Sequence, residues 1–90
     1  MSYEIRGIIN QIFPEMGGVG KNGTEWRKKQ ILIEESDQYK NNVLLQVWGD
    51  KIELLDAFTE GMEASFSFNI KSREVRGNWY SENQVFKINK

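Results

Sequence analysis

The sequence predicts an all-β domain, a small barrel of five strands with one short helix, and three observations support this prediction. Five segments alternate apolar and polar residues, or are rich in β-branched and aromatic residues, as strands are. One segment between the third and the fourth of them carries apolar residues at helical spacing. The chain has only 90 residues, and a closed barrel suits a small domain because closure removes exposed strand edges.

The first predicted strand covers residues 3–13, in which isoleucines recur and Gly7 interrupts the pattern as a bulge or a sharp bend would. Pro14 ends this strand because proline cannot donate a hydrogen bond to a β-ladder. Residues 15–24 contain four glycines and are predicted to form a flexible loop.

The second and third strands are predicted over residues 25–35 and 43–49, with a polar turn over residues 36–42 between them. Each of these strands has one apolar face, which is predicted to point into the core. The residues on the apolar faces are Ile31, Ile33, Val43, Leu45 and Val47. The outward faces are predicted to carry Trp26, Lys28 and Gln30 from the second strand, and Leu44, Gln46 and Trp48 from the third.

A short helix is predicted over residues 51–58, where Ile52 and Leu55 fall on one side. Asp50 is predicted to be its N-cap, and Glu53 follows three residues later as in a capping box.

The fourth and fifth strands are predicted over residues 62–70 and 79–88, separated by a charged loop over residues 71–78. The inward residues of the fourth strand are predicted to be Ala64, Phe66, Phe68 and Ile70. Trp79 and Tyr80 are adjacent on a strand and therefore point to opposite faces, which predicts that one of them belongs to the core.

The order of elements, β-β-β-α-β-β, is that of an OB-fold, a five-stranded barrel in which strands one to three precede a helix that plugs one end. The competing small fold is an SH3-like barrel, which has no helix after its third strand. The sequence therefore predicts a single OB-fold domain over residues 1–90.

The composition excludes several classes of function. The chain has no cysteine and no histidine, which excludes disulfides, imidazole catalysis and zinc sites with those ligands. No catalytic residue, metal or cofactor is predicted, and the chain is not expected to be an enzyme. No apolar run is long enough to span a membrane, and the N-terminus has no signal-peptide pattern, so a cytoplasmic protein is predicted.

Four stretches of the chain resemble a small bacterial and phage family that is catalogued as a domain of unknown function. These stretches are Met1–Gly7, Ile31–Glu34, Leu54–Asp56 and Glu60–Glu74. The resemblance covers nearly the whole chain and implies an OB-fold related to single-stranded DNA-binding proteins. It implies no particular binding residues, so the site below is predicted from the chain itself.

Charge and aromatic residues predict the position of a binding face. The formal net charge is only −1, but residues 21–29 and 71–76 are locally basic, while residues 34–37 and 50–63 are acidic. An OB-fold binds its ligands across strands two and three, between the loop after strand one and the loop between strands four and five. That rule selects the two basic segments and all three tryptophans, and it places the acidic segments elsewhere. The candidate nucleic-acid-binding residues are Lys21, Trp26, Lys28, Trp48, Lys71, Arg73, Arg76 and Trp79.

These residue types predict binding of single-stranded DNA, or of RNA, with little sequence preference. Bases stack on aromatic rings, while lysine and arginine contact phosphates. One small barrel covers few nucleotides, so a homodimer or homotetramer acting in replication or recombination is predicted. Two alternatives stay open at this point. Trp26 and Trp48 are also suited to an interface between proteins, which would make the chain an OB-fold protein-interaction module without nucleic-acid binding. Aromatic rings also stack on sugars, although basic loops are not needed for that.

Overall fold

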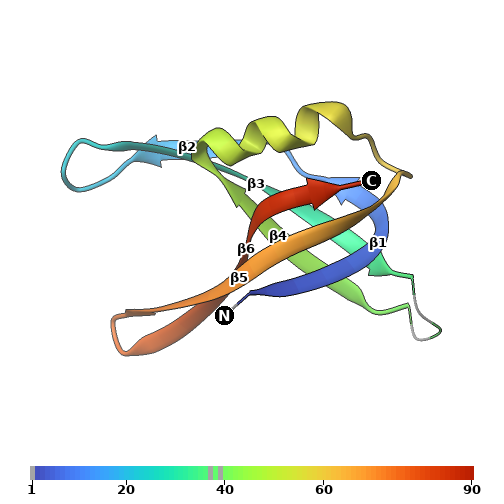
Figure 1. Ribbon diagram of the computed structural model, residues 1–90. Coiled ribbons are helices and arrows are strands. Elements are labelled where there is room, and N and C mark those ends of the chain that lie inside the picture. Colours follow the sequence, from blue (N-terminus) through green and yellow to red (C-terminus); the bar gives the residue numbers. More distant parts are fainter. Residues whose placement is uncertain (1, 37, 39) are drawn as a thin grey trace.

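The computed structural model describes residues 2–36, 38 and 40–90, and these residues form six strands and one short helix (Figure 1). The strands are β1 (Tyr3–Ile12), β2 (Met16–Val19), β3 (Glu25–Glu35), β4 (Asn42–Trp48), β5 (Glu63–Val75) and β6 (Asn78–Asn89). The helix, η1 (Gly49–Ala57), lies between β4 and β5. The predicted order of barrel strands and helix is therefore confirmed, and β2 is an additional strand.

β1 closes the barrel because it pairs with two strands. Its first part is antiparallel to β5, and its later part is antiparallel to β3. The closed circuit is thus β1, β5, β6, β4, β3 and again β1, while β2 pairs only with β3. Gly7 is paired in both ladders, opposite Glu35 on β3 and Ala64 on β5.

The junction between β4 and β6 is the thinnest part of this circuit. The two strands are parallel and share one paired position, Gln46 with Gln84. Side chains complete the junction: the Asn83 backbone N–H donates to Gln46 Oε1 at 2.9 Å, and Asn83 Nδ2 donates to the Leu44 carbonyl at 3.0 Å. Gln46 is consequently buried although it points away from the core.

The core confirms most of the predicted inward residues. Ile31, Ile33, Leu45, Val47, Ala64 and Phe66 are completely buried, together with Ile9 of β1. Ile70 was predicted to point inward, but half of its surface is exposed. The reason is that β5 runs beyond the barrel after Phe68, so its inward face no longer meets a core.

The helix that covers one end of the barrel is a 3-10 helix and not the predicted α-helix. Ile52, Leu55 and Phe58 are buried against the core and are spaced three residues apart, which matches the 3-10 period. The N-cap is Trp48, without a side-chain cap bond, and Asp50 lies in the first turn, so the predicted capping role of Asp50 is wrong. Within the described part of the chain, no helix has the length and apolar character needed to cross a membrane.

Two hairpins extend beyond the barrel, and both project toward the left in Figure 1. β2 and β3 form one of them, and β2 with the turn after it lies in the segment over residues 15–24 that is predicted to be a flexible loop. β5 and β6 form the other, which continues through residues predicted to be a charged loop and turns at Arg76 and Gly77, with φ angles of 52° and 83°. Two successive residues with positive φ form the type I′ turn that suits the twist of a hairpin.

Gly7 should be required for closure. A Cβ atom at this position would lie 2.3 Å from the carbonyl oxygen of Glu34 and 2.7 Å from Cγ2 of Ile33. We expect Gly7→Ala to lower the free energy of unfolding in urea by about 1–3 kcal/mol, the usual cost of overpacking. Gly20→Ala is the control, since its Cβ would meet only the Thr24 carbonyl oxygen at 3.5 Å. An equal effect of both substitutions would contradict this role of Gly7.

Candidate nucleic-acid interface

Trp26 and Trp48 meet on the outer face of the barrel, as predicted. Trp48 is the last residue of β4 and pairs with Lys28 on β3, two residues after Trp26. The ring centroids of the two tryptophans are 5.8 Å apart and the rings are tilted by 46°. Trp26 is 40% exposed. Trp48 is half-buried. A tryptophan pair with one exposed ring on a small domain is a typical feature of a binding surface.

Glu82 of β6 joins the strands of this face. Lys28 Nζ donates a hydrogen bond to Glu82 Oε2 at 3.1 Å, and the two groups form an ion pair. Trp48 Nε1 donates a hydrogen bond to Glu82 Oε1 at 3.2 Å. Gln84 Nε2 donates to the same Oε1 at 3.2 Å. Lys28 Nζ also lies 5.0 Å from the centroid of the Trp48 ring, within the range of a cation–π contact. The Lys28 and Glu82 side chains are only 15% and 19% exposed.

The contacts of Glu82 control its protonation. Burial raises the pKa of Glu82, but the hydrogen bonds from Gln84 and Lys28, the charge of Lys28 and the hydrogen bond from Trp48 together outweigh burial. The net pKa of Glu82 lies below its ordinary value of about 4.5. The carboxylate is therefore negatively charged at neutral pH.

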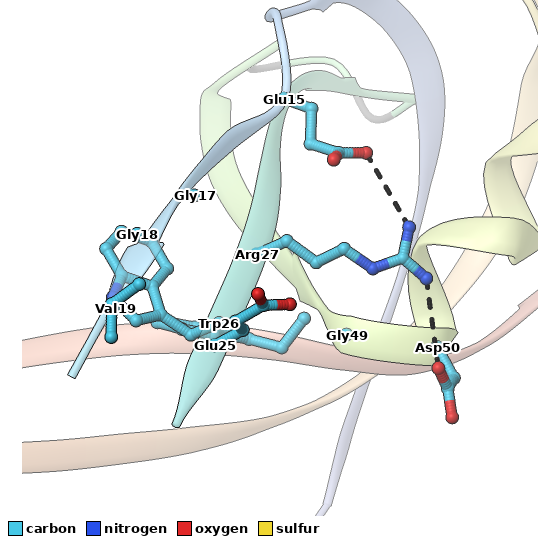
Figure 2. A pocket seen from close by; sticks show the side chains of 10 residues that line it. Glu15, Gly17, Gly18, Val19, Glu25, Trp26, Arg27, Gly49 and Asp50 are labelled. Carbon is cyan, nitrogen blue, oxygen red and sulfur yellow. Dashed lines mark ion pairs between the residues drawn. The ribbon is translucent and has the colours of Figure 1, made fainter. Parts of the chain in front are cut away.

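A first groove, of about 720 Å³, lies between the β2–β3 hairpin and the start of η1 (Figure 2). The Trp26 ring lies against Gly18, where a Cβ would come within 3.2 Å of three ring atoms. Arg27 extends between Glu15 and Asp50, with ion-pair distances of 3.8 Å to each (Figure 2). Trp48 forms part of the wall of this groove as well.

The charge of the first groove differs from the prediction. Three carboxylates line it, those of Glu15, Glu25 and Asp50, and Arg27 is its one basic side chain among the described residues. The acidic segment that begins at Asp50 was expected to lie away from the binding face. Its first residue lies at the groove because η1 starts immediately after Trp48.

A second groove, of about 380 Å³, adjoins Trp48 on the side of the β5–β6 hairpin. Its lining residues are Trp48, Lys71, Ser72, Arg73, Tyr80, Glu82 and Gln84. Arg73 is paired with Tyr80 and Lys71 with Glu82 across the hairpin, so these side chains share one face. Within the described ranges, neither Lys71 nor Arg73 has a carboxylate at ion-pair distance.

The structure brings five of the eight predicted site residues together on this face: Trp26, Lys28, Trp48, Lys71 and Arg73. Lys21 and Arg76 lie at the tips of the two hairpins and line neither groove. Trp79 is paired with Glu74 on the opposite face of the β5–β6 hairpin. Trp79 and Tyr80 are 70% and 53% exposed, so the prediction that one of them is core is wrong.

Sequence reasoning missed Tyr80, Glu82 and Gln84 as residues of this face. The signal that could have found them is their alternation along β6, which puts all three on one side of the strand. Among the described residues, no group of three or more acidic side chains is placed to hold a metal ion.

The closed five-stranded barrel, the helix between β4 and β5 and the outer face of β3 and β4 define an OB-fold. The chain belongs to the DUF3127 family, described as a domain of unknown function, whose profile matches residues 4–89. This confirms the resemblance that the sequence showed.

Two solved structures are similar to this chain. The first is the second OB-fold domain of replication protein A from Methanococcus maripaludis, at 17% identity and a TM-score of 0.68, covering 98% of this chain and 81% of that one. The second is a small single-stranded DNA-binding protein from Streptomyces coelicolor, at 9% identity and a TM-score of 0.47, covering 98% and 91%. The first similarity shows the fold. A comparison with curated proteins found no significant match.

The depressed pKa of Glu82 makes the stability of the barrel dependent on pH. Its charged contacts stabilise the folded state above the ordinary pKa of about 4.5 and are lost as the pH falls through the lower folded value. We expect Glu82→Gln to lower the free energy of unfolding by about 1 kcal/mol at pH 7. The substitution should also make the loss of stability on acidification through and below the ordinary pKa of about 4.5 shallower. Urea titrations across this range measure both effects, and parallel pH curves would contradict the assignment.

Proposed function

We propose that this protein binds single-stranded nucleic acid, with little sequence preference, across the two adjoining grooves. The observation that carries the proposal is that Trp48 forms part of the wall of both grooves. Trp26 on one side of it, and Tyr80 with Lys71 and Arg73 on the other, therefore belong to one continuous surface. Bases stack on the three aromatic side chains, and phosphates lie along the basic hairpin.

The physical properties of this face suit single strands. Stacking of a base on an aromatic side chain contributes about 1–3 kcal/mol and needs no particular sequence. A duplex hides the faces of its bases, so stacking selects for single strands. Lys71 and Arg73 make no ion pair within the described residues, and they release counterions when they meet phosphates. The similarity to an OB-fold domain of a replication protein is consistent with this proposal and with a role in replication or recombination.

The small size of the face makes self-association part of the proposal. Three aromatic platforms accommodate only a few nucleotides, which gives a weak complex for one barrel. A homodimer or homotetramer would place several faces on one strand and raise the overall affinity by avidity.

The proposal is tested by titrating tryptophan fluorescence with a thymidine oligonucleotide of about 30 nucleotides, beside a duplex of the same length. We expect quenching by the single strand that weakens steeply as salt is raised, and little response to the duplex. Absence of any response at low salt would contradict nucleic-acid binding. It would favour a protein-interaction surface, for which the exposed Trp26 and the 68% exposed Val19 beside it are suited.

Tyr80 and Trp79 provide a matched pair of substitutions on opposite faces of one hairpin. Tyr80→Ala removes a stacking platform from the second groove and should weaken oligonucleotide binding by about 1–3 kcal/mol. Trp79→Ala should leave the affinity nearly unchanged, because its side chain points away from that groove. Anisotropy of a labelled oligonucleotide measures both without depending on protein fluorescence. A larger effect of Trp79→Ala would restore the sequence-based assignment of Trp79 to the site.

A further inference from the structure

Glu82 is an acidic residue in the middle of a face that we propose to bind a polyanion. It lines the second groove together with Lys71 and Arg73. A carboxylate at this position repels phosphate, so its presence needs an explanation. Its three hydrogen-bond donors come from Lys28 on β3, Trp48 on β4 and Gln84 on its own strand.

The effect of Glu82 on Lys28 is specific. Lys28 is 85% covered, its ammonium group is 3.1 Å from the Glu82 carboxylate, and it lies 5.0 Å from the centroid of the Trp48 ring. Its positive charge is thus neutralised within the protein. Lys71 and Arg73 differ from it, since both are exposed and have no carboxylate at ion-pair distance within the described ranges.

We infer that Glu82 determines the affinity and the path of the ligand by withholding Lys28 from its phosphates. This inference rests on the proposed function. The backbone of the bound strand then follows the β5–β6 hairpin, with Lys71 and Arg73 as its phosphate contacts. Lys28 stays paired at the base of Trp48 and supports the ring from β3. The face makes one phosphate contact fewer than its lysines and arginines would allow, so its complex with a single strand dissociates readily.

The test is the salt dependence of oligonucleotide binding by Glu82→Gln. Glutamine has nearly the same shape, and its carbonyl oxygen can still accept from Trp48 Nε1, but it cannot neutralise Lys28. We expect the affinity at low salt to rise about fivefold, as for one additional contact between unit charges at about 4 Å that is screened as in bulk water. The slope of log K against log salt should steepen by about 0.7, the value for one more phosphate contact on a single strand.

Two further variants separate this mechanism from a general change of charge. Glu74→Gln removes the same charge from the same hairpin, but Glu74 is paired with Trp79 on the opposite face. It should leave the slope unchanged. The double variant Lys28→Gln/Glu82→Gln removes both partners of the ion pair, and its slope should return to that of the wild type.

The sign of the change in affinity decides the outcome. If wild-type protein binds and Glu82→Gln binds more weakly or with an unchanged slope, Glu82 only positions Trp48, and the inference is wrong while the proposed function stands. If wild-type protein and Glu82→Gln both fail to bind, the proposed function fails and the inference with it. Glu82→Met is a second neutral variant with the same expected steepening, and near-UV circular dichroism verifies that each variant is folded.

Discussion

The double pairing of β1 is the constraint on which the rest of the structure depends. One strand must lie against β5 and then against β3, so it has to bend sharply within the barrel wall. Gly7 makes this bend possible because the Glu34 carbonyl occupies the space that any Cβ would need. Backbone hydrogen bonds from Ile9 to the Met62 carbonyl, at 2.9 Å, and from Gly61 to the Ile9 carbonyl, at 2.7 Å, hold the later part of β1 against the turn before β5.

Closure at β1 also determines the geometry of the candidate binding face. Because the circuit is closed on that side, β4 and β6 must meet on the other, where only one ladder position is paired. Side chains strengthen this junction on the outer face of the barrel. Gln46 accepts from the Asn83 backbone N–H across it, and Glu82 joins β6 to Lys28 and Trp48. The network that fixes Trp48 is therefore also part of what holds the barrel shut. Under the proposed function, these contacts hold Trp48 in place before a base stacks on it, which lowers the entropy lost on binding.

The sequence predicts the barrel well and the two hairpins poorly, and burial explains the difference. Three predicted strands each bury one face, and they cover residues 25–35, 43–49 and 62–70. The alternation of apolar and polar residues along them therefore predicts the strands correctly. Residues 71–78 bury neither face, and their pairing comes from the ladder and from contacts such as that of the Ser72 and Ser81 hydroxyls, at 2.9 Å. Asn22 and Gly23, a dipeptide typical of tight hairpins, were the available signal for the β2–β3 hairpin. The spacing of Ile52, Leu55 and Phe58 likewise contained the 3-10 period, although it was interpreted as an α-helix.

The candidate site shows why charge counted along a sequence is a weak guide to charge on a surface. Arg27 and Lys28 are adjacent in a basic segment, but alternation sends them to opposite faces of β3, and each meets carboxylates there. The partner of Lys28 lies 54 residues away, across a junction that no local pattern reveals. The segment that contains them therefore contributes less positive potential than its composition suggests. Lys71 and Arg73 have no carboxylate at ion-pair distance within the described ranges, and Glu82, which is paired with Lys71 across the hairpin, binds Lys28 instead. The basic character of the proposed binding face thus depends mainly on the β5–β6 hairpin, part of which is predicted from the sequence to be a loop.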